Sequence, residues 1–194
     1  MKIPIIISFL LNVLCVKSQT ADFELIDEMY SNWKNSPNKC QTFFYADVMD
    51  TYTIERVREL FLVESSFIKY SQKTDTTNAE RIQFTAVERE YIINQLNNLN
   101  SNSWPDLILP KSKVISFTKI DSIQKSVNDQ KLDPLIRLCH SVKIFSHPIF
   151  LRDNSICLFF SGTVDFAMKE GEFWIYRKEG FHWKKYTPLY RWIE

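Results

Sequence analysis

The sequence predicts an α+β fold in which N-terminal helices pack on a C-terminal antiparallel β-meander. In the first half of the chain, apolar residues recur at steps of three and four, which is the period of an amphipathic helix. In the last third, runs of β-branched and aromatic residues are separated by short turns, as in antiparallel strands. Helices early and strands late are typical of α+β proteins. With only three glycines among 194 residues, the composition also indicates a domain with a packed core.

The first 18 residues have the pattern of a secretory signal peptide. Lys2 precedes an apolar run over residues 3–14, and smaller residues follow near the expected cleavage site. The run is about a dozen residues long, which is shorter than the roughly 20 that a membrane-spanning helix needs. We therefore expect residues 1–18 to be removed before Gln19. Residues 19–194 are then expected to form a single exported domain, in the periplasm or outside the cell.

A second interpretation of the leader is a lipid-modified cysteine at Cys15, which would tether the chain to a membrane. Bacterial lipoprotein signals place leucine three residues before the cysteine and a small residue directly before it. Asn12 and Leu14 fit this pattern poorly. We therefore expect a soluble mature chain, with a membrane as partner only if Cys15 is lipidated.

The predicted mature chain keeps three cysteines, Cys40, Cys139 and Cys157. Thiols tend to pair in the oxidising compartments that exported proteins enter, but an odd number leaves one thiol over. A turn centred on residues 153–154 sets Cys157 opposite Phe150, which leaves Cys139 about 36 Å away along a straight strand at roughly 3.3 Å per residue. Because bonded cysteines have Cα atoms within about 7 Å, a bridge between Cys139 and Cys157 is not expected. Other pairings, and burial of the cysteines as small apolar residues, stay open.

Apolar periodicity and turn residues divide the chain ahead of the meander into helices and strands. The predicted elements are helices over residues 21–34, 54–63 and 85–99 and strands over residues 42–48, 67–70 and 114–123. The third helix is marked best, because Thr85 and Glu88 form a capping box in which each side chain accepts the other residue's backbone N–H. A polar loop is expected over residues 71–80.

The last third of the chain is predicted to form four antiparallel strands. Their expected bounds are residues 142–151, 156–164, 172–178 and 181–192. The connections between them are only a few residues long, which favours hairpins between neighbours in sequence. These four strands form the predicted meander.

The last hairpin carries the candidate binding residues. With Glu179-Gly180 as a two-residue turn, Trp174, Tyr176, Phe181 and Trp183 share one side of the hairpin. Aromatic side chains gathered on a surface are typical of sites that bind a partner or ligand. We therefore predict these four residues as a binding surface for an unknown protein or small molecule. The alternative is an aromatic core face, with lysine and arginine stems lying over the rings.

Motifs that carry catalysis or bind metals are not found in the sequence. Trp104-Pro105-Asp106 has the form of the acid loop of tyrosine phosphatases, but no cysteine is followed by an arginine at the spacing this chemistry needs. The loop is expected instead to be a helix-ending turn with its tryptophan in the core. His140, His147 and His182 form no metal-binding pair. No catalytic residue, metal or cofactor is predicted.

The charge balance argues against nucleic acid as a partner. The formal net charge of the chain is +1, and loss of Lys2 and Lys17 with the leader makes the mature chain slightly acidic. Proteins that bind duplex nucleic acid without sequence preference carry a basic excess instead.

The C-terminal part of the chain resembles small exported proteins of unknown function from Bacteroidetes-type bacteria. The likeness extends over residues 85–194 and is carried by residues 145–150, 154–160, 174–178, 183–184 and 191–193. Those proteins end in a meander whose last hairpin reads tyrosine, lysines, glycine, tryptophan and lysine. The resemblance implies export and this type of sheet, and it implies no activity, cofactor or catalytic residue. By element order alone, the chain is also similar to the cone-shaped nuclear-transport-factor-2-like group.

These features predict an exported, non-enzymatic binding or interaction domain. Two alternatives stay open. One is a small hydrolase whose site is assembled in three dimensions around His147 or His182. The other is a structural component of the cell envelope, which would have no concave pocket.

Overall fold

The structure is a computed structural model that describes residues 24–30, 42–70, 80–101, 103–106, 108–120, 141–165 and 168–193. The chain divides into two compact units, Met1–Pro37 and Asn38–Glu194. In the first unit, residues 24–30 are helical, within the predicted helix at 21–34. The rest of that helix and the predicted leader lie outside the described residues. So do four residues on which predictions depend, Cys15, Cys40, Cys139 and His140.

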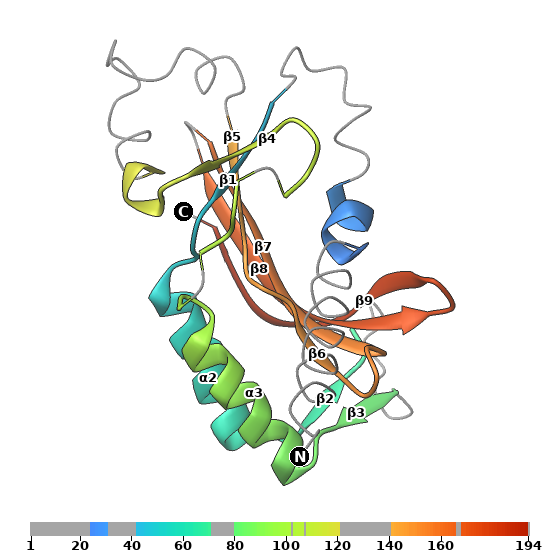
Figure 1. The fold of residues 1–194 in the computed structure, drawn as a ribbon. Helices are drawn as coiled ribbons and strands as arrows, with labels where there is room; N and C mark the ends of the chain where they lie inside the picture. Colours follow the sequence, from blue (N-terminus) through green and yellow to red (C-terminus); the bar gives the residue numbers. More distant parts are fainter. Residues whose placement is uncertain are drawn as a thin grey trace, which may run out of the picture. The chain divides into compact units, whose positions relative to one another are not determined.

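The second unit is built on a mixed seven-stranded sheet (Figure 1). Its strands are β1 (Phe43–Ala46), β4 (Ser112–Ile115), β5 (Ser141–Phe145), β6 (Ile149–Leu151), β7 (Ile156–Asp165), β8 (Lys169–Glu179) and β9 (His182–Ile193). The order across the sheet is β4-β1-β5-β7-β8-β9, and β6 pairs with one end of β7. From β5 onwards, neighbouring strands are antiparallel. The predicted α+β class and the antiparallel C-terminal strands are therefore confirmed.

β1 and β4 extend this sheet with parallel pairs that the sequence did not predict. β1 lies between β4 and β5 and runs parallel to both. Parallel neighbours are not linked by a short turn, so their pairing leaves no local signal in the sequence. The predicted strand at 114–123 is wrong in its extent, because β4 ends at Ile115 and residues 117–120 are helical. Residues 121–123 lie outside the described part of the chain.

The predicted strand at 142–151 is two strands, because the chain leaves the sheet at residues 146–148. Ser146 donates its backbone N–H to the carbonyl of Phe160 at 3.2 Å and accepts the Phe160 N–H on its hydroxyl at 3.0 Å. The hydroxyl thus replaces a backbone carbonyl, and Pro148 has no N–H to donate to a ladder. β5 therefore pairs with the second half of β7, and β6 pairs with its first residues.

The β6–β7 turn contains three successive left-handed residues, 152–154, with φ values of 52°, 54° and 62°. Asparagine and aspartate accept this backbone region readily, whereas an arginine rarely does. Arg152 donates from Nε to the carboxylate of Glu88 at 2.7 Å, which holds it in place. The turn sets Phe150 opposite Cys157, as predicted, and Cys157 is buried within β7.

Besides the helical residues 117–120, two longer helices and a short ribbon complete the described part of the second unit. They are α2 (Thr51–Val63), α3 (Ala86–Asn98) and the antiparallel pair β2 (Ser66–Ile68) and β3 (Arg81–Gln83). The strand β3 was not predicted, because three residues are too few to show a period of two. Most of the predicted loop at 71–80 lies outside the described residues.

The two helices begin at side chains that cap them. In α3, Glu88 donates its N–H to Oγ1 of Thr85 at 3.1 Å, and Thr85 donates its N–H to the Glu88 carboxylate at 2.8 Å. This confirms the predicted capping box. In α2, the carboxylate of Asp50 accepts the N–H of Thr53 at 2.8 Å, so the helix begins three residues earlier than its apolar pattern predicts. Such a cap satisfies a backbone donor that the first helical turn leaves open.

One apolar cluster joins the helices to one face of the sheet. It includes Phe61 of α2, Ile92 and Leu96 of α3, and Phe160 and Ile175 of the sheet, all with no exposed surface. The helices therefore cover this face of the sheet through direct packing of apolar side chains, which is the main source of stability in such a layer.

The opposite face of the sheet carries a row of aromatic rings across four strands. The row consists of Tyr45 on β1, Phe145 on β5, Phe159 on β7 and Tyr176 on β8, with successive centroids 5.5, 6.4 and 6.3 Å apart. All four rings are buried. Cross-strand aromatic pairs of this kind each stabilise a sheet by roughly 0.2–1 kcal/mol. Both faces of the sheet are thus apolar at its centre.

Candidate functional site

A pocket of about 320 Å³ lies beside the N-terminus of α2, over the helix-covered face of the sheet. Its lining residues are Asp50, Tyr52, Thr53, Phe117, Ile120, Ile144, Val164, Lys169, Tyr190 and Trp192. The volume falls at the lower end of the range of about 300–1,000 Å³ that is usual for small-molecule sites. The size therefore suits a compact ligand.

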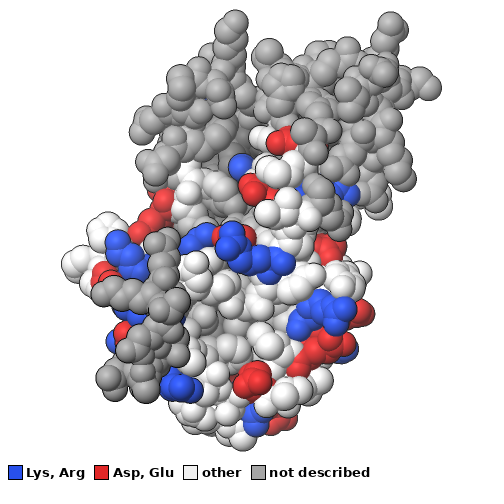
Figure 2. Space-filling model, turned by 180° about the vertical axis from the view of Figure 1, so that it is seen from behind, with Lys and Arg blue, Asp and Glu red and all other residues white. Residues whose placement is uncertain are grey.

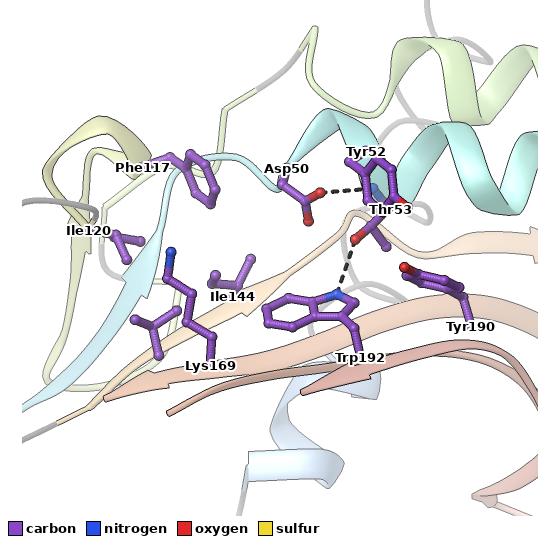
Figure 3. A pocket seen from close by; sticks show the side chains of 10 residues that line it. Asp50, Tyr52, Thr53, Phe117, Ile120, Ile144, Lys169, Tyr190 and Trp192 are labelled. Atoms are coloured by element: carbon purple, nitrogen blue, oxygen red, sulfur yellow. Dashed lines mark hydrogen bonds between the residues drawn. The ribbon is translucent and has the colours of Figure 1, made fainter. Parts of the chain in front are cut away.

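A chain of hydrogen bonds ties α2 to β9 along one wall of the pocket (Figure 3). The indole N–H of Trp192 donates to Oγ1 of Thr53 at 3.1 Å, and the backbone N–H of Thr53 donates to the carboxylate of Asp50 at 2.8 Å. Thr53 is 1% exposed, so its hydroxyl needs a partner within the protein. These bonds hold the Trp192 ring in a fixed position as part of the wall.

Lys169 enters the pocket from the side of the sheet. It is the first residue of β8 and pairs with Val164 on β7. Its amine extends between Ile120 and Ile144 towards Phe117 (Figure 3). Among the described residues that line the pocket, Lys169 alone is cationic. An ammonium group at this position can contact an anionic or hydrogen-bond-accepting group of a ligand.

Next to Trp192, two glycines lie opposite each other in the sheet. Gly162 on β7 pairs with Gly171 on β8. A Cβ atom added at Gly171 would lie 2.6 Å from the ring of Phe160 and 2.8 Å from the ring of Trp192, which is closer than carbon atoms can approach. Glycine at this position leaves the space that the two rings fill. Gly171 therefore supports the packing of Trp192 beside the pocket.

Two tyrosines line the pocket, and an arginine outside its lining binds one of them. The rings of Tyr52 and Tyr190 meet edge to face, with centroids 6.4 Å apart. Arg56, one turn further along α2, donates from Nε and Nη2 to the hydroxyl of Tyr52, each at 3.0 Å. Burial raises the pKa of Tyr190, and the neighbouring Tyr52 raises it further. The Tyr190 hydroxyl therefore stays protonated at neutral pH and can donate a hydrogen bond.

The structure divides the four predicted binding residues into three buried rings and one exposed ring. Trp174, Tyr176 and Trp183 are 6%, 3% and 9% exposed. Phe181 is 91% exposed, in the turn between β8 and β9. None of the four lines the pocket described above. Their role in binding stays a prediction.

The β8–β9 turn is formed by residues 180–181, not by residues 179–180 as predicted. Trp183 therefore pairs with Lys178 rather than with Tyr176. The glycine of the turn has a φ of 64°, which suits the first position of a two-residue hairpin turn. This requirement on the backbone sets the register of the hairpin.

Three donor groups contact the carboxylate of Glu172 on β8. The indole N–H of Trp174 and Nη2 of Arg191 each lie 2.7 Å from its carboxylate, and the ammonium of Lys185 also contacts it. Partial burial raises the pKa of Glu172, but the bonds from Lys185 and Trp174 and the two positive charges lower it by more. A shallow hollow of about 420 Å³ lies beside this cluster.

In Figure 2, basic and acidic residues of the described chain are intermixed on the face in view.

Trp104-Pro105-Asp106 serves packing, as expected. Trp104 is 5% exposed, and its indole N–H donates to the carbonyl of Phe145 at 3.0 Å. Asp106 accepts the N–H of Val114 at 3.0 Å, which pins the loop to β4. The carboxylate therefore has a structural partner in the fold.

The two described histidines lie on different elements. His147, in the connection between β5 and β6, stacks on Trp104 with ring centroids 3.8 Å apart. His182 is the first residue of β9. A site built around either histidine stays a prediction.

The described residues contain neither a metal-binding cluster nor a helix that could span a membrane. Their His, Cys, Asp and Glu side chains form no group of three or more that could hold a metal ion. The helices of this part of the chain include none that is long and apolar enough to cross a membrane.

The pocket was not predicted from the sequence, because its residues come from separate segments. Asp50 and Thr53 belong to the start of α2, whereas Lys169 and Trp192 come from the first residues of β8 and the last residues of β9, more than 20 residues apart in sequence. Asp50 has a local signal, since aspartate is a preferred helix cap. The other lining residues are of types found throughout ordinary helices and strands.

Comparisons of the chain with protein-family models, with curated proteins and with solved structures find no match. The function of this protein is therefore inferred from the geometry of its own residues.

Proposed function

We propose that this protein is an exported, non-enzymatic binding protein that takes a small, largely apolar ligand into the pocket beside α2. The observation that carries the proposal is the pocket itself, whose walls are mostly apolar with a few polar groups at fixed positions. This combination is typical of small-molecule sites, in which apolar walls bury the body of the ligand and polar groups orient it.

The arrangement of the polar groups favours binding over catalysis. Asp50 and Thr53 accept the hydrogen bonds that hold the start of α2 and the ring of Trp192. A general base or a nucleophile acts by presenting a lone pair to the substrate. In this structure the printed bonds of these two residues stabilise the wall, and the side chain of Lys169 extends towards the ligand space (Figure 3).

Native mass spectrometry tests the proposal, with purified protein incubated with an organic extract of the producing culture. We expect one class of compound to remain bound. At a free concentration 100-fold above its Kd, such a ligand stabilises the fold by about 2.7 kcal/mol. This corresponds to a rise in Tm of about 5–10 °C for a chain of this size. Absence of any bound compound and of any rise in Tm would count against the proposal.

A pair of lysine variants locates the binding site. Lys169→Met removes the cation from the pocket, and we expect it to weaken binding at least tenfold, in line with the loss of a charge-assisted hydrogen bond. Lys184→Met makes the same change on an exposed part of β9 outside the pocket and should leave binding unchanged. If both variants bound the ligand with the affinity of the wild type, the ligand would occupy a site other than this pocket. Turnover of the bound compound would favour the hydrolase alternative.

Export is part of the proposal and is supported by the leader pattern and by the resemblance over residues 85–194. Intact-mass measurement of the protein from its native host tests it. A chain that begins at Gln19 in the soluble fraction is the expected result. A chain that begins at a lipid-modified Cys15 in the membrane fraction would show tethering instead, and a chain that begins at Met1 would contradict export.

A further inference from the structure

The tip of the β8–β9 hairpin exposes a phenylalanine that the fold does not use. Phe181 takes the second position of the two-residue turn and is 91% exposed, more than any other large apolar residue of the described chain. The turn depends on Gly180, whose φ of 64° suits its first position. Residues in tight turns are usually Gly, Asn, Asp or Ser. A solvated phenyl ring adds nothing to the stability of the hairpin, so any use of it lies in a contact outside the fold.

The strands behind the tip carry cations on both sides. Arg177 lies directly opposite Lys184, and both side chains are exposed. Like charges in directly opposed positions destabilise a pair of strands. The ion pair of Arg177 with Glu80 offsets part of this repulsion, and an anionic surface in front of the hairpin would also attract Lys184. On the other side of the hairpin, the ammonium of Lys178 lies 5.4 Å from the ring centroid of Trp183.

Acidic residues near the hairpin offset part of this charge. Glu80 forms an ion pair with Arg177, and Glu172 forms one with Lys185. Within residues 177–185, Glu179 is the one acid beside four lysines and arginines. The tip therefore keeps a positive excess next to its exposed ring.

We propose that this hairpin tip docks on an anionic lipid surface, with the ring of Phe181 inserted among the lipids and Lys178 and Lys184 facing the headgroups. A fluid lipid surface can accept one protruding ring. A stable protein interface instead buries about 800 Å² on each partner around a packed centre. Lysine and arginine near an anionic leaflet are attracted to it, and the ring adds the burial of its apolar area. This docking requires neither a lipid on Cys15 nor a ligand in the pocket.

Flotation with lipid vesicles tests the proposal. The full mature chain is mixed with vesicles of phosphatidylcholine and phosphatidylglycerol or with vesicles of phosphatidylcholine alone. We expect flotation with the anionic vesicles, and its loss at high salt. Phe181→Ala should lower the partition coefficient about tenfold, and Lys184→Gln about fivefold. Phe181→Trp should retain binding, and the fluorescence emission of the added tryptophan should shift to shorter wavelength when vesicles are present.

Two matched variants serve as controls. Val63→Ala removes an apolar side chain that is 79% exposed on α2, and Lys113→Gln removes a cation from β4 at the opposite edge of the sheet. Both should float like the wild type. Equal flotation with neutral vesicles, unchanged flotation of Phe181→Ala, or no flotation of the wild type would each overturn the proposal. Because the substituted residues are exposed, all variants should fold, which near-ultraviolet circular dichroism checks.

Discussion

The two ends of α2 differ in what they pack against. Its C-terminal end places Phe61 in contact with the rings of Phe67 and Phe84, with centroid distances of 5.0–5.8 Å among the three. Its N-terminal end, at Asp50 and Thr53, borders the pocket. One helix thus belongs to a dense apolar core at one end and to a concave, partly polar site at the other.

Element lengths explain the difference. A helix of 13 residues, such as α2 or α3, is about 20 Å long at 1.5 Å per residue. A strand of 11 residues, such as β8, is about 36 Å long at roughly 3.3 Å per residue. The helix pair therefore cannot cover the whole length of the long strands. Where helical cover ends, side chains of several segments surround a space, and a ligand site becomes possible.

The largest expected effect is at the packed end of α2. Phe61→Ala removes a ring with no exposed surface and should lower the free energy of unfolding by about 3–5 kcal/mol. Tyr52→Ala at the pocket rim, where the side chain is 55% exposed, should change it by about 0.5 kcal/mol or less. Urea denaturation measures both. Similar losses of unfolding free energy in the two variants would show that the two ends of α2 do not differ in packing.

A smaller effect is expected where the rings pack beside the pocket. Gly171→Ala introduces a methyl group between Phe160 and Trp192 and should destabilise the protein by about 1–3 kcal/mol. The near-ultraviolet circular dichroism of the protein should change with it, because Trp192 is one of its five tryptophans. Gly180→Ala is the matched control, because no atom lies within 4 Å of its added Cβ and only the left-handed φ opposes it. Unchanged near-ultraviolet circular dichroism in Gly171→Ala would mean that the Trp192 ring does not depend on this glycine.

Next in size is the hydrogen bond between α2 and β9. Thr53→Val keeps the shape of the side chain but leaves the indole N–H of Trp192 without its acceptor, which should destabilise the protein by about 1–2 kcal/mol. Thr53→Ser keeps the hydroxyl and should retain the bond. The tryptophan fluorescence of the two variants and their urea midpoints distinguish these cases. Equal behaviour of valine and serine would show that the bond contributes little.

The smallest expected effect concerns Glu88, which caps α3 and pairs with Arg152. The hydrogen bond from Arg152, with the capping bonds of Thr85, lowers the pKa of Glu88 from its ordinary 4.5 to about 2. A lowered pKa means that the unfolded chain binds a proton more readily than the folded chain. The stabilisation is therefore complete above pH 4.5 and is lost as the pH falls towards 2. Glu88→Gln should lower the free energy of unfolding at neutral pH by about 1 kcal/mol. In urea titrations at several pH values, the variant should lose less stability than the wild type between pH 4.5 and 2. If the variant lost as much stability as the wild type over this pH range, Glu88 would not be the group responsible.

Much of the secondary structure follows from short patterns in the sequence. The capping box at Thr85 and Glu88 predicted the start of α3, because both partners lie within one helical turn. The C-terminal strands were predicted from alternation and from turns of a few residues. The break in the strand at 142–151 was missed, because the hydroxyl of Ser146 finds its partner in Phe160, on a different strand. The register of the last hairpin was also predicted wrongly, because a left-handed glycine can take either position of a two-residue turn. In the structure, Gly180 takes the first position.

The candidate site depends on contacts between residues far apart in the chain. Trp192 donates to Thr53 across more than a hundred residues of sequence, and Lys169 reaches the same pocket from the start of β8. No spacing rule connects these positions. The exposed Phe181, in contrast, was predicted as a binding residue because it lies in a local hairpin.

By itself, the sequence determined the α+β class, the helices α2 and α3 and the antiparallel order of the last strands, because periodicity, caps and tight turns act over a few residues. Only the tertiary structure decided that β1 and β4 join this sheet in parallel, that Trp174, Tyr176 and Trp183 are buried while Phe181 is exposed, and that a pocket opens at Asp50 and Lys169. These features arise from packing between distant segments. Their energies depend on which surfaces meet, and no local pattern of residues encodes that choice.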